Sequence, residues 1–155
     1  MASQSWSVYY ANSKVLVPTR VETTAGVGMS VDPMEIVDAD NTAGLKRTIL
    51  TTIAKSNPIV PHPNQDEMSQ PITIHKKLDF KSYRAFNNTA MLWHVRNINN
   101  LYEIEFTKVP ENRRGYVPDL SKTITFPQGT TVEIVVDKLI EIIQQAHHQK
   151  IVEET

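Results

Sequence analysis

Cysteine is absent from this chain of 155 residues, and its absence excludes several chemistries at once. Without thiol groups the protein forms no disulfide, no thiolate zinc site and no cysteine nucleophile. The first residues also lack the basic and apolar regions of a secretory signal, and no apolar run approaches the roughly 18 residues of a membrane span. We therefore expect a cytoplasmic protein that does not enter a membrane.

An excess of charge of one sign is missing as well, since 16 Lys and Arg stand against 17 Asp and Glu. General nucleic-acid binders usually carry a basic surplus, so this class is disfavoured, although a local basic patch is compatible with a neutral total. Apolar residues make up 40% of the chain, which is ordinary for a globular protein. The length fits one compact domain over residues 1–155.

The familiar catalytic and cofactor motifs are also missing. Gly26 and Gly28 form a Gly-x-Gly pair, but no third glycine, following helix or Lys-Ser/Thr completes a dinucleotide or phosphate loop. We interpret this pair as a loop or a bulge. Neither a Gly-x-Ser-x-Gly elbow nor a Ser-x-x-Lys sequence occurs. The sequence therefore predicts no catalytic residues and no cofactor.

The five histidines do not form a metal-binding pattern. No His-x-His or His-Glu-x-x-His sequence is present. His147 and His148 are adjacent, and adjacent side chains on a helix point about 100° apart. The acidic run of Asp32, Glu35, Asp38 and Asp40 lacks the spacing of a calcium loop. We interpret it as charge at a helix N-terminus and in a solvated loop, with a negative surface for a basic partner as the alternative. We predict no metal site.

The clearest structural pattern is a β-hairpin over residues 91–109 with its turn at Asn99-Asn100, because Asn tolerates the positive φ of a two-residue turn. Apolar pairs then fall on one face and charged pairs on the other, and a slip of one residue would destroy the match. The expected pairs are Trp93 with Phe106, His94 with Glu105, Val95 with Ile104 and Arg96 with Glu103. We interpret His94 and Glu105 as a solvated pair, with a raised histidine pKa as the alternative.

Two further segments predict strands of the same antiparallel sheet. Residues 6–23 are expected to form a first hairpin, whose turn at Asn12-Ser13 pairs Tyr10 with Val15, Tyr9 with Leu16 and Val8 with Val17. Pro18 then lies at an edge or a bulge, since it lacks the N–H of a regular strand. A third strand is expected over residues 121–126.

Helices are expected over residues 41–56 and 131–146. Asp40 is the predicted N-cap of the first, and Thr130 with Glu133 forms a capping box for the second. Both helices carry an apolar stripe, so the predicted fold is α+β, an antiparallel sheet with the two helices packed on it. Residues 147–155 are expected to be a frayed polar tail.

The segment 58–71 carries four prolines and is expected to be an exposed loop that cannot join a sheet. A short strand over residues 72–75 and a brief helix over residues 78–86 are expected to follow. Long ordered loops in small domains are often functional, which makes this loop a candidate contact region.

The leading functional hypothesis is a small, soluble, non-catalytic protein–protein interaction module of the inhibitor or immunity type. It rests on size, missing catalytic motifs and the proline-rich loop, and its likeness to bacterial immunity proteins is one of size and style. We expect the partner to be another protein. The predicted partner-binding residues are His62, Asp66, Glu67, Lys76, Lys77, Arg84, Arg113 and Arg114.

Two alternatives stay open. A small enzyme or ligand-binding protein without a sequence motif predicts a deep pocket lined by several of His62, His75 and His94 with acidic side chains. Nucleic-acid binding predicts one continuous basic stripe formed by Lys76, Lys77, Arg84, Arg113 and Arg114. For these cations we favour ordinary solvated charges around a short amphipathic helix.

Overall fold

The computed structural model describes residues 3–68, 74–108 and 117–154, and of residues 68, 108, 117–121, 153 and 154 it describes the backbone alone. The strands are β1 (Ser3–Ala11), β2 (Lys14–Thr23), β3 (Gly28–Asp38), β4 (Ile59–Val60), β5 (Met91–Ile98), β6 (Leu101–Lys108) and β7 (Val117–Thr125). The helices are α1 (Thr42–Ala54), α2 (Gln65–Met68), the 3-10 helix η1 (Ile74–Leu78), α3 (Tyr83–Thr89) and α4 (Val132–Glu154).

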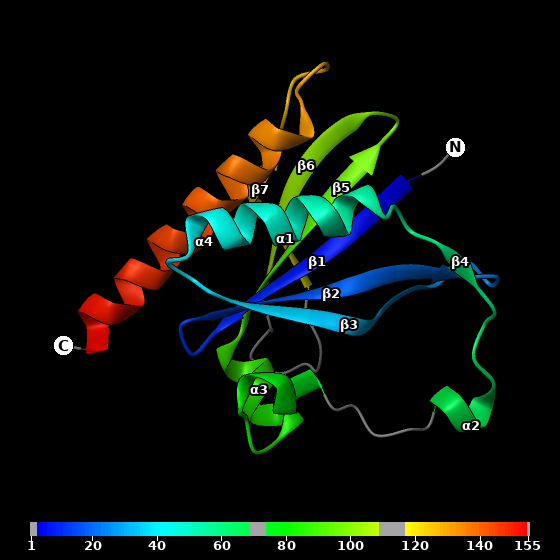
Figure 1. Cartoon of the computed structure of the whole chain (residues 1–155), viewed down its shortest axis with the longest axis horizontal. Helices are drawn as coiled ribbons and strands as arrows, with labels where there is room; N and C mark the ends of the chain where they lie inside the picture. The colour runs from blue at the N-terminus through cyan, green and yellow to red at the C-terminus, as the bar shows by residue number, and fades with distance from the viewer. Residues whose placement is uncertain (1–2, 69–73, 109–116, 155) are drawn as a thin grey trace.

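The described strands form one seven-stranded sheet in the order β3-β2-β1-β5-β6-β7, with β4 paired to β2. Neighbours in this order are antiparallel, and β4 is parallel to β2. Helices α1 and α4 lie together over one face of the sheet, as Figure 1 shows. The α+β prediction is confirmed. In the part of the chain that the structure describes, no helix is long and apolar enough to cross a membrane.

The hairpin of β5 and β6 has the predicted register. Trp93 pairs with Phe106, and the three other expected pairs are also present. Asn99 and Asn100 have φ values of 54° and 67°, which is the left-handed conformation that the turn requires. The rings of Trp93 and Phe106 lie 5.7 Å apart on the face that α4 covers. Matching of side chains was therefore sufficient to fix this register.

The first hairpin is confirmed near its turn and differs farther away. Tyr10 pairs with Val15 and Tyr9 with Leu16, and Asn12 and Ser13 both have positive φ. The expected third pair, Val8 with Val17, is not among the pairs of the described strands, since β1 and β2 pair only over the three residues nearest the turn on each strand. On its other edge, strand β2 pairs with β3 from Lys14 to Glu22, with the expected irregularity at Pro18.

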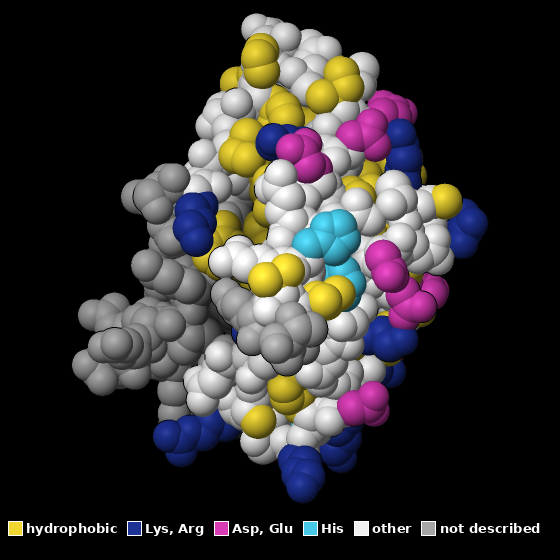
Figure 2. Space-filling view, turned by 90° about the vertical axis from the view of Figure 1, so that its left-hand side faces the viewer, with side chains coloured by type: hydrophobic (Ala, Val, Ile, Leu, Met, Phe, Trp, Pro, Cys, Tyr) yellow, Lys and Arg dark blue, Asp and Glu magenta, His cyan; other side chains and the backbone are white. Residues whose placement is uncertain are grey.

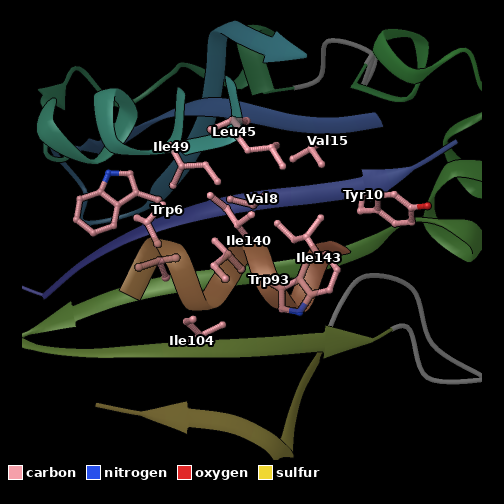
Figure 3. Packing of buried hydrophobic residues seen from close by; sticks show 14 of the residues in the cluster. Trp6, Val8, Tyr10, Val15, Leu45, Ile49, Trp93, Ile104, Ile140 and Ile143 are labelled. Atoms are coloured by element: carbon pink, nitrogen blue, oxygen red, sulfur yellow. The ribbon is translucent and has the colours of Figure 1, made fainter. Parts of the chain in front are cut away.

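The main core lies between the sheet and helices α1 and α4. Figure 3 shows Leu45 and Ile49 of α1 and Ile140 and Ile143 of α4 directed at side chains of the central strands. The predicted helical stripes are thus buried. Asn41, not Asp40, caps α1, since its side-chain oxygen accepts a hydrogen bond from Gly44 N–H at 3.0 Å. Asn41 immediately precedes α1, so its side chain reaches the free backbone N–H groups of the first turn.

A second, smaller core covers one end of the opposite face. Helices η1 and α3 place Leu78 and Phe86 against Leu16 and Ala11 of the first hairpin. Two sequence predictions are wrong here. A strand was expected over residues 72–75, but its two described residues belong to the 3-10 helix Ile74–Leu78. The helix expected from residue 78 begins at Tyr83, because Ser82 caps it by accepting a hydrogen bond from Ala85 N–H at 3.1 Å.

The proline-rich loop and the polar tail also differ from expectation. Ile59 and Val60 form β4 and join the sheet beside Glu22 and Thr23, because the prolines lie outside this short pair. Helix α4 continues through the expected tail to Glu154. His147 explains the continuation, since its ring is buried and bonded to the first strand.

Candidate functional site

A groove of about 430 Å³ opens between the C-terminal half of α4 and strands β5, β6 and β7. Side chains of the sheet and of α4 form its apolar walls, while Lys122, Gln145 and Gln149 are polar side chains at the same opening. Figure 2 looks onto this side of the molecule and shows hydrophobic side chains in a hollow. The apolar lining is Met91, Trp93, Ile104, Phe106, Ile124 and Ile142.

One charged side chain, the cation Lys122, is among the described residues that line the groove. Nζ of Lys122 lies 4.8 Å from the ring centre of Phe106, so this ammonium group covers part of the apolar wall through a cation–π contact. Lys150 lines a second hollow of about 230 Å³, which lies beside the turn of the first hairpin. Met91 lines both hollows, and they therefore flank the C-terminal half of α4.

Two apolar side chains extend this surface toward the end of the helix. Ile151, which also lines the second hollow, is 44% exposed, and Val152 is 72% exposed. We call the groove, the second hollow and these two residues the α4 face. An apolar centre with a polar rim is the usual composition of a protein-binding surface.

The opposite face of the sheet carries a row of polar residues across three strands. Ser7 of β1 pairs with His94 of β5, which pairs with Glu105 of β6. Ser7 Oγ and His94 Nδ1 lie 3.1 Å apart, and both Ser7 and Glu105 are buried. Because the serine is buried, this Ser–His contact does not present a hydroxyl group to a substrate.

The environment of His94 corrects both interpretations of its pairing with Glu105. The pKa of His94 is lowered to about 4, chiefly by burial and also by the positive charges of Arg20 and Arg96, while a hydrogen bond with the backbone of Trp6 acts in the opposite direction. The pair is therefore neither solvated nor one that raises the histidine pKa. At neutral pH the imidazole is uncharged.

Three of the other histidines lie on separate segments of the chain. His62 Nδ1 lies 2.9 Å from the hydroxyl of Thr23, and His147 Nδ1 lies 2.9 Å from that of Tyr10. His75 is buried in η1, where its Nδ1 has no partner among the described residues. The described residues contain no cluster of three potential metal ligands. The enzyme alternative required several of His62, His75 and His94 to line one pocket. In the described part of the chain these histidines do not come together.

Six of the eight predicted partner-binding residues lie in the described part of the chain, on several elements. Lys76 and Lys77 belong to η1 and Arg84 to α3, so these three share one end of the molecule, while His62, Asp66 and Glu67 precede them, after β4 and on α2 (Figure 1). None of these six lines the groove.

Two of these side chains form contacts within the protein. Lys77 pairs with Asp32 at 3.3 Å, and Glu67 accepts a hydrogen bond from the backbone of Asn64 as a local cap. Arg113 and Arg114 lie outside the described residues. The basic-stripe alternative therefore stays a prediction.

Sequence reasoning missed the groove because its residues come from three strands and a helix. One signal was present. Ile151 and Val152 continue the apolar character of α4 into the segment that we expected to be a polar tail. Such a pair beyond the buried stripe indicates an apolar surface without a core to bury it.

Comparison with known proteins bears on the fold of this chain alone. No protein-family model matches the chain, and no curated protein is similar enough to match. The fold is an α+β sheet with helices on both faces. Among solved structures, the chain is similar to a protein of unknown function, NMB0488 from Neisseria meningitidis, with 13% identity and a TM-score of 0.62 over 90% of this chain and 93% of that one. This likeness shows the fold alone.

Proposed function

We propose that this protein is a non-catalytic module that binds another protein through the α4 face. The apolar groove beside α4 is the observation that carries the proposal. Its walls are side chains that a globular domain usually buries, and its rim is polar, as at the centre and edge of a protein interface. Among the described residues that line it, no histidine, aspartate or glutamate supplies acid–base chemistry.

The rim charge specifies the chemistry of the partner. Lys14, Lys46, Lys77 and Lys138 each form an ion pair with a carboxylate. Lys122 and Lys150, on the two sides of α4, form none with the described residues. The expected occupant is therefore a partner segment with an apolar anchor side chain and acidic residues beside it.

Within this class, we propose an inhibitor of the immunity-protein kind, which neutralises an enzyme or toxin by occupying its surface. A module of this kind needs a contact surface and no reaction of its own, and the α4 face supplies such a surface. The identified partner should then lose its activity when the purified protein is added at a 1:1 ratio.

Photo-crosslinking tests the surface before the partner is known. A crosslinking amino acid replaces Gln145 in the groove, and a second variant carries it at Ile134, which is 55% exposed on the same helix. The two positions are about three turns apart on nearly the same helix face, so Ile134 is a matched control. We expect one crosslinked protein from position 145 in the native cells and none from position 134. Equal products from both positions, or none from either, would contradict the proposal.

A small apolar ligand is the second candidate function, because a volume of about 430 Å³ falls within the range of roughly 300–1,000 Å³ for small-molecule sites. Native mass spectrometry of the protein purified from its own cells distinguishes the two. A bound small molecule that is lost on Ala146→Trp would favour the ligand. A clean mass of the chain alone would favour the protein partner.

A further inference from the structure

The C-terminal half of α4 is poor in charge. Between Ile142 and Val152, Lys150 is the one residue with a formal charge at pH 7. The preceding part of the helix carries Glu133, Asp137, Lys138 and Glu141. Depletion of charge is typical of the centre of a protein interface. This half of the helix belongs to the α4 face, so the inference below rests on the proposed function of that face.

One stripe of this half-helix combines apolar and amide side chains. Ile142, Gln145, Gln149 and Val152 follow one another at intervals of three and four residues, so they share one side of α4. Ile142 is half-buried at the groove, and Val152 is 72% exposed. In Figure 1 the last turn of α4, which carries Val152, extends past the strands of the sheet. The fold thus leaves the apolar end of the stripe largely in water.

The stripe matches itself when two copies of α4 lie antiparallel. Ile142 of one copy is then opposite Val152 of the other, and Gln145 is opposite Gln149. A two-fold rotation repeats both contacts, as in an isologous interface. Apolar residues therefore meet apolar residues and amides meet amides, without a like-charge contact along the stripe.

The charges beside the stripe are complementary in the same arrangement. Glu153 follows Val152 in the sequence, and helical spacing places position 153 on the side of α4 that carries Gln149. Lys122 and Ile142 line the same groove. Because the end of the second α4 lies opposite Ile142, position 153 of each copy approaches Lys122 of the other.

We propose that a second copy of this chain occupies the α4 face when no other partner is bound, through an antiparallel pair of α4 helices. A contact of a few helical turns is smaller than the roughly 1,200–2,000 Å² of a stable interface, so we expect a weak dimer with a dissociation constant of about micromolar order. A different protein that binds this face then displaces the second copy.

Sedimentation equilibrium of the purified full chain at increasing concentration tests the dimer. We expect a monomer–dimer equilibrium that Val152→Glu weakens at least tenfold, because the variant places a carboxylate against Ile142 of the other copy. Ile134→Glu adds the same charge at an exposed position of α4 outside the paired segment and should leave the equilibrium unchanged. A monomer at every concentration, or equal dimerisation of Val152→Glu and the wild type, would overturn the proposal.

Charge reversal tests the antiparallel register. Lys122→Glu and Glu153→Lys each place like charges together across the interface, so each should raise the dissociation constant of the dimer severalfold. The double variant restores opposite charges and should recover the wild-type value. A double variant that dimerises no better than the single variants would overturn this arrangement.

The dimer and the proposed function can fail separately, because the dimer is measured on the purified protein alone. A monomeric protein that still crosslinks to another protein from position 145 in the native cells would contradict the dimer and support the function. A dimer that crosslinks only to its second copy from this position would support the dimer and contradict the function.

Discussion

The hydroxyl group of Tyr10 lies 2.9 Å from Nδ1 of His147, and this contact joins the first strand to the last helix. The two residues are 137 positions apart, and their rings meet edge to face with centroids 5.7 Å apart. His147 is almost fully buried, so it needs a polar partner inside the protein. The contact explains why α4 remains ordered beyond Ala146 and therefore why the α4 face exists.

Tyr10→Phe should destabilise the protein by about 1–3 kcal/mol, because it leaves the buried nitrogen of His147 without the hydroxyl partner. Urea denaturation followed by circular dichroism measures the change. Tyr102→Phe is the control, since Tyr102 is partly exposed and packs at the edge of the same core. Equal stability of the wild type and Tyr10→Phe would show that this contact does not hold α4 in place.

His94 should make stability depend on pH between its unfolded and folded pKa values. The pKa is about 4 in the folded protein and about 6.5 when unfolded, so the unfolded chain binds the proton first as the pH falls. Stability is then complete above pH 6.5 and decreases toward pH 4, by about 3 kcal/mol in total.

The measurement for His94 is urea denaturation at several pH values in the wild type and in His94→Gln. The variant should lose much of this pH dependence. His148→Gln removes an exposed histidine and should keep it. If His94→Gln and the wild type show the same slope between pH 6.5 and 4, the lowered pKa is wrong.

Two isoleucines on α4 test the depth of the main core. Ile143 is fully buried, whereas Ile134 is 55% exposed on the same helix. Ile143→Ala should cost about 2–5 kcal/mol, because it removes buried apolar contacts and leaves a cavity. Ile134→Ala should change stability by less than about 0.5 kcal/mol. Similar costs for both variants, measured by chemical denaturation, would contradict the placement of α4.

The parts of the fold that the sequence predicted are those set by local patterns. The hairpin of β5 and β6 matches residue for residue, because Trp93, Val95 and their partners fit in only one register. The buried stripes of α1 and α4 follow from helical spacing alone. In these elements, neighbours in sequence are also the main determinants of structure.

The candidate sites could not be predicted in this way, because they depend on which strands become neighbours. We expected β1 and β2 to stay paired as far as Val8 and Val17, but they separate before this pair. The sequence therefore did not predict that Arg20 of β2 would lie near His94 of β5. From the sequence alone, His94 was a solvated residue of a charged pair. The strand order places buried Ser7 beside it and makes it neutral.

The most direct test of the central claim is the affinity of the crosslinked partner for the Lys122→Glu variant of this protein. Isothermal titration calorimetry compares this variant with the wild type and with Lys81→Glu, which reverses an exposed charge beside α3. Because the partner is expected to place acidic residues near Lys122, we predict that Lys122→Glu raises the dissociation constant at least tenfold and that Lys81→Glu leaves it unchanged. Binding of Lys122→Glu with wild-type affinity would contradict the assignment of the α4 face as the partner-binding surface.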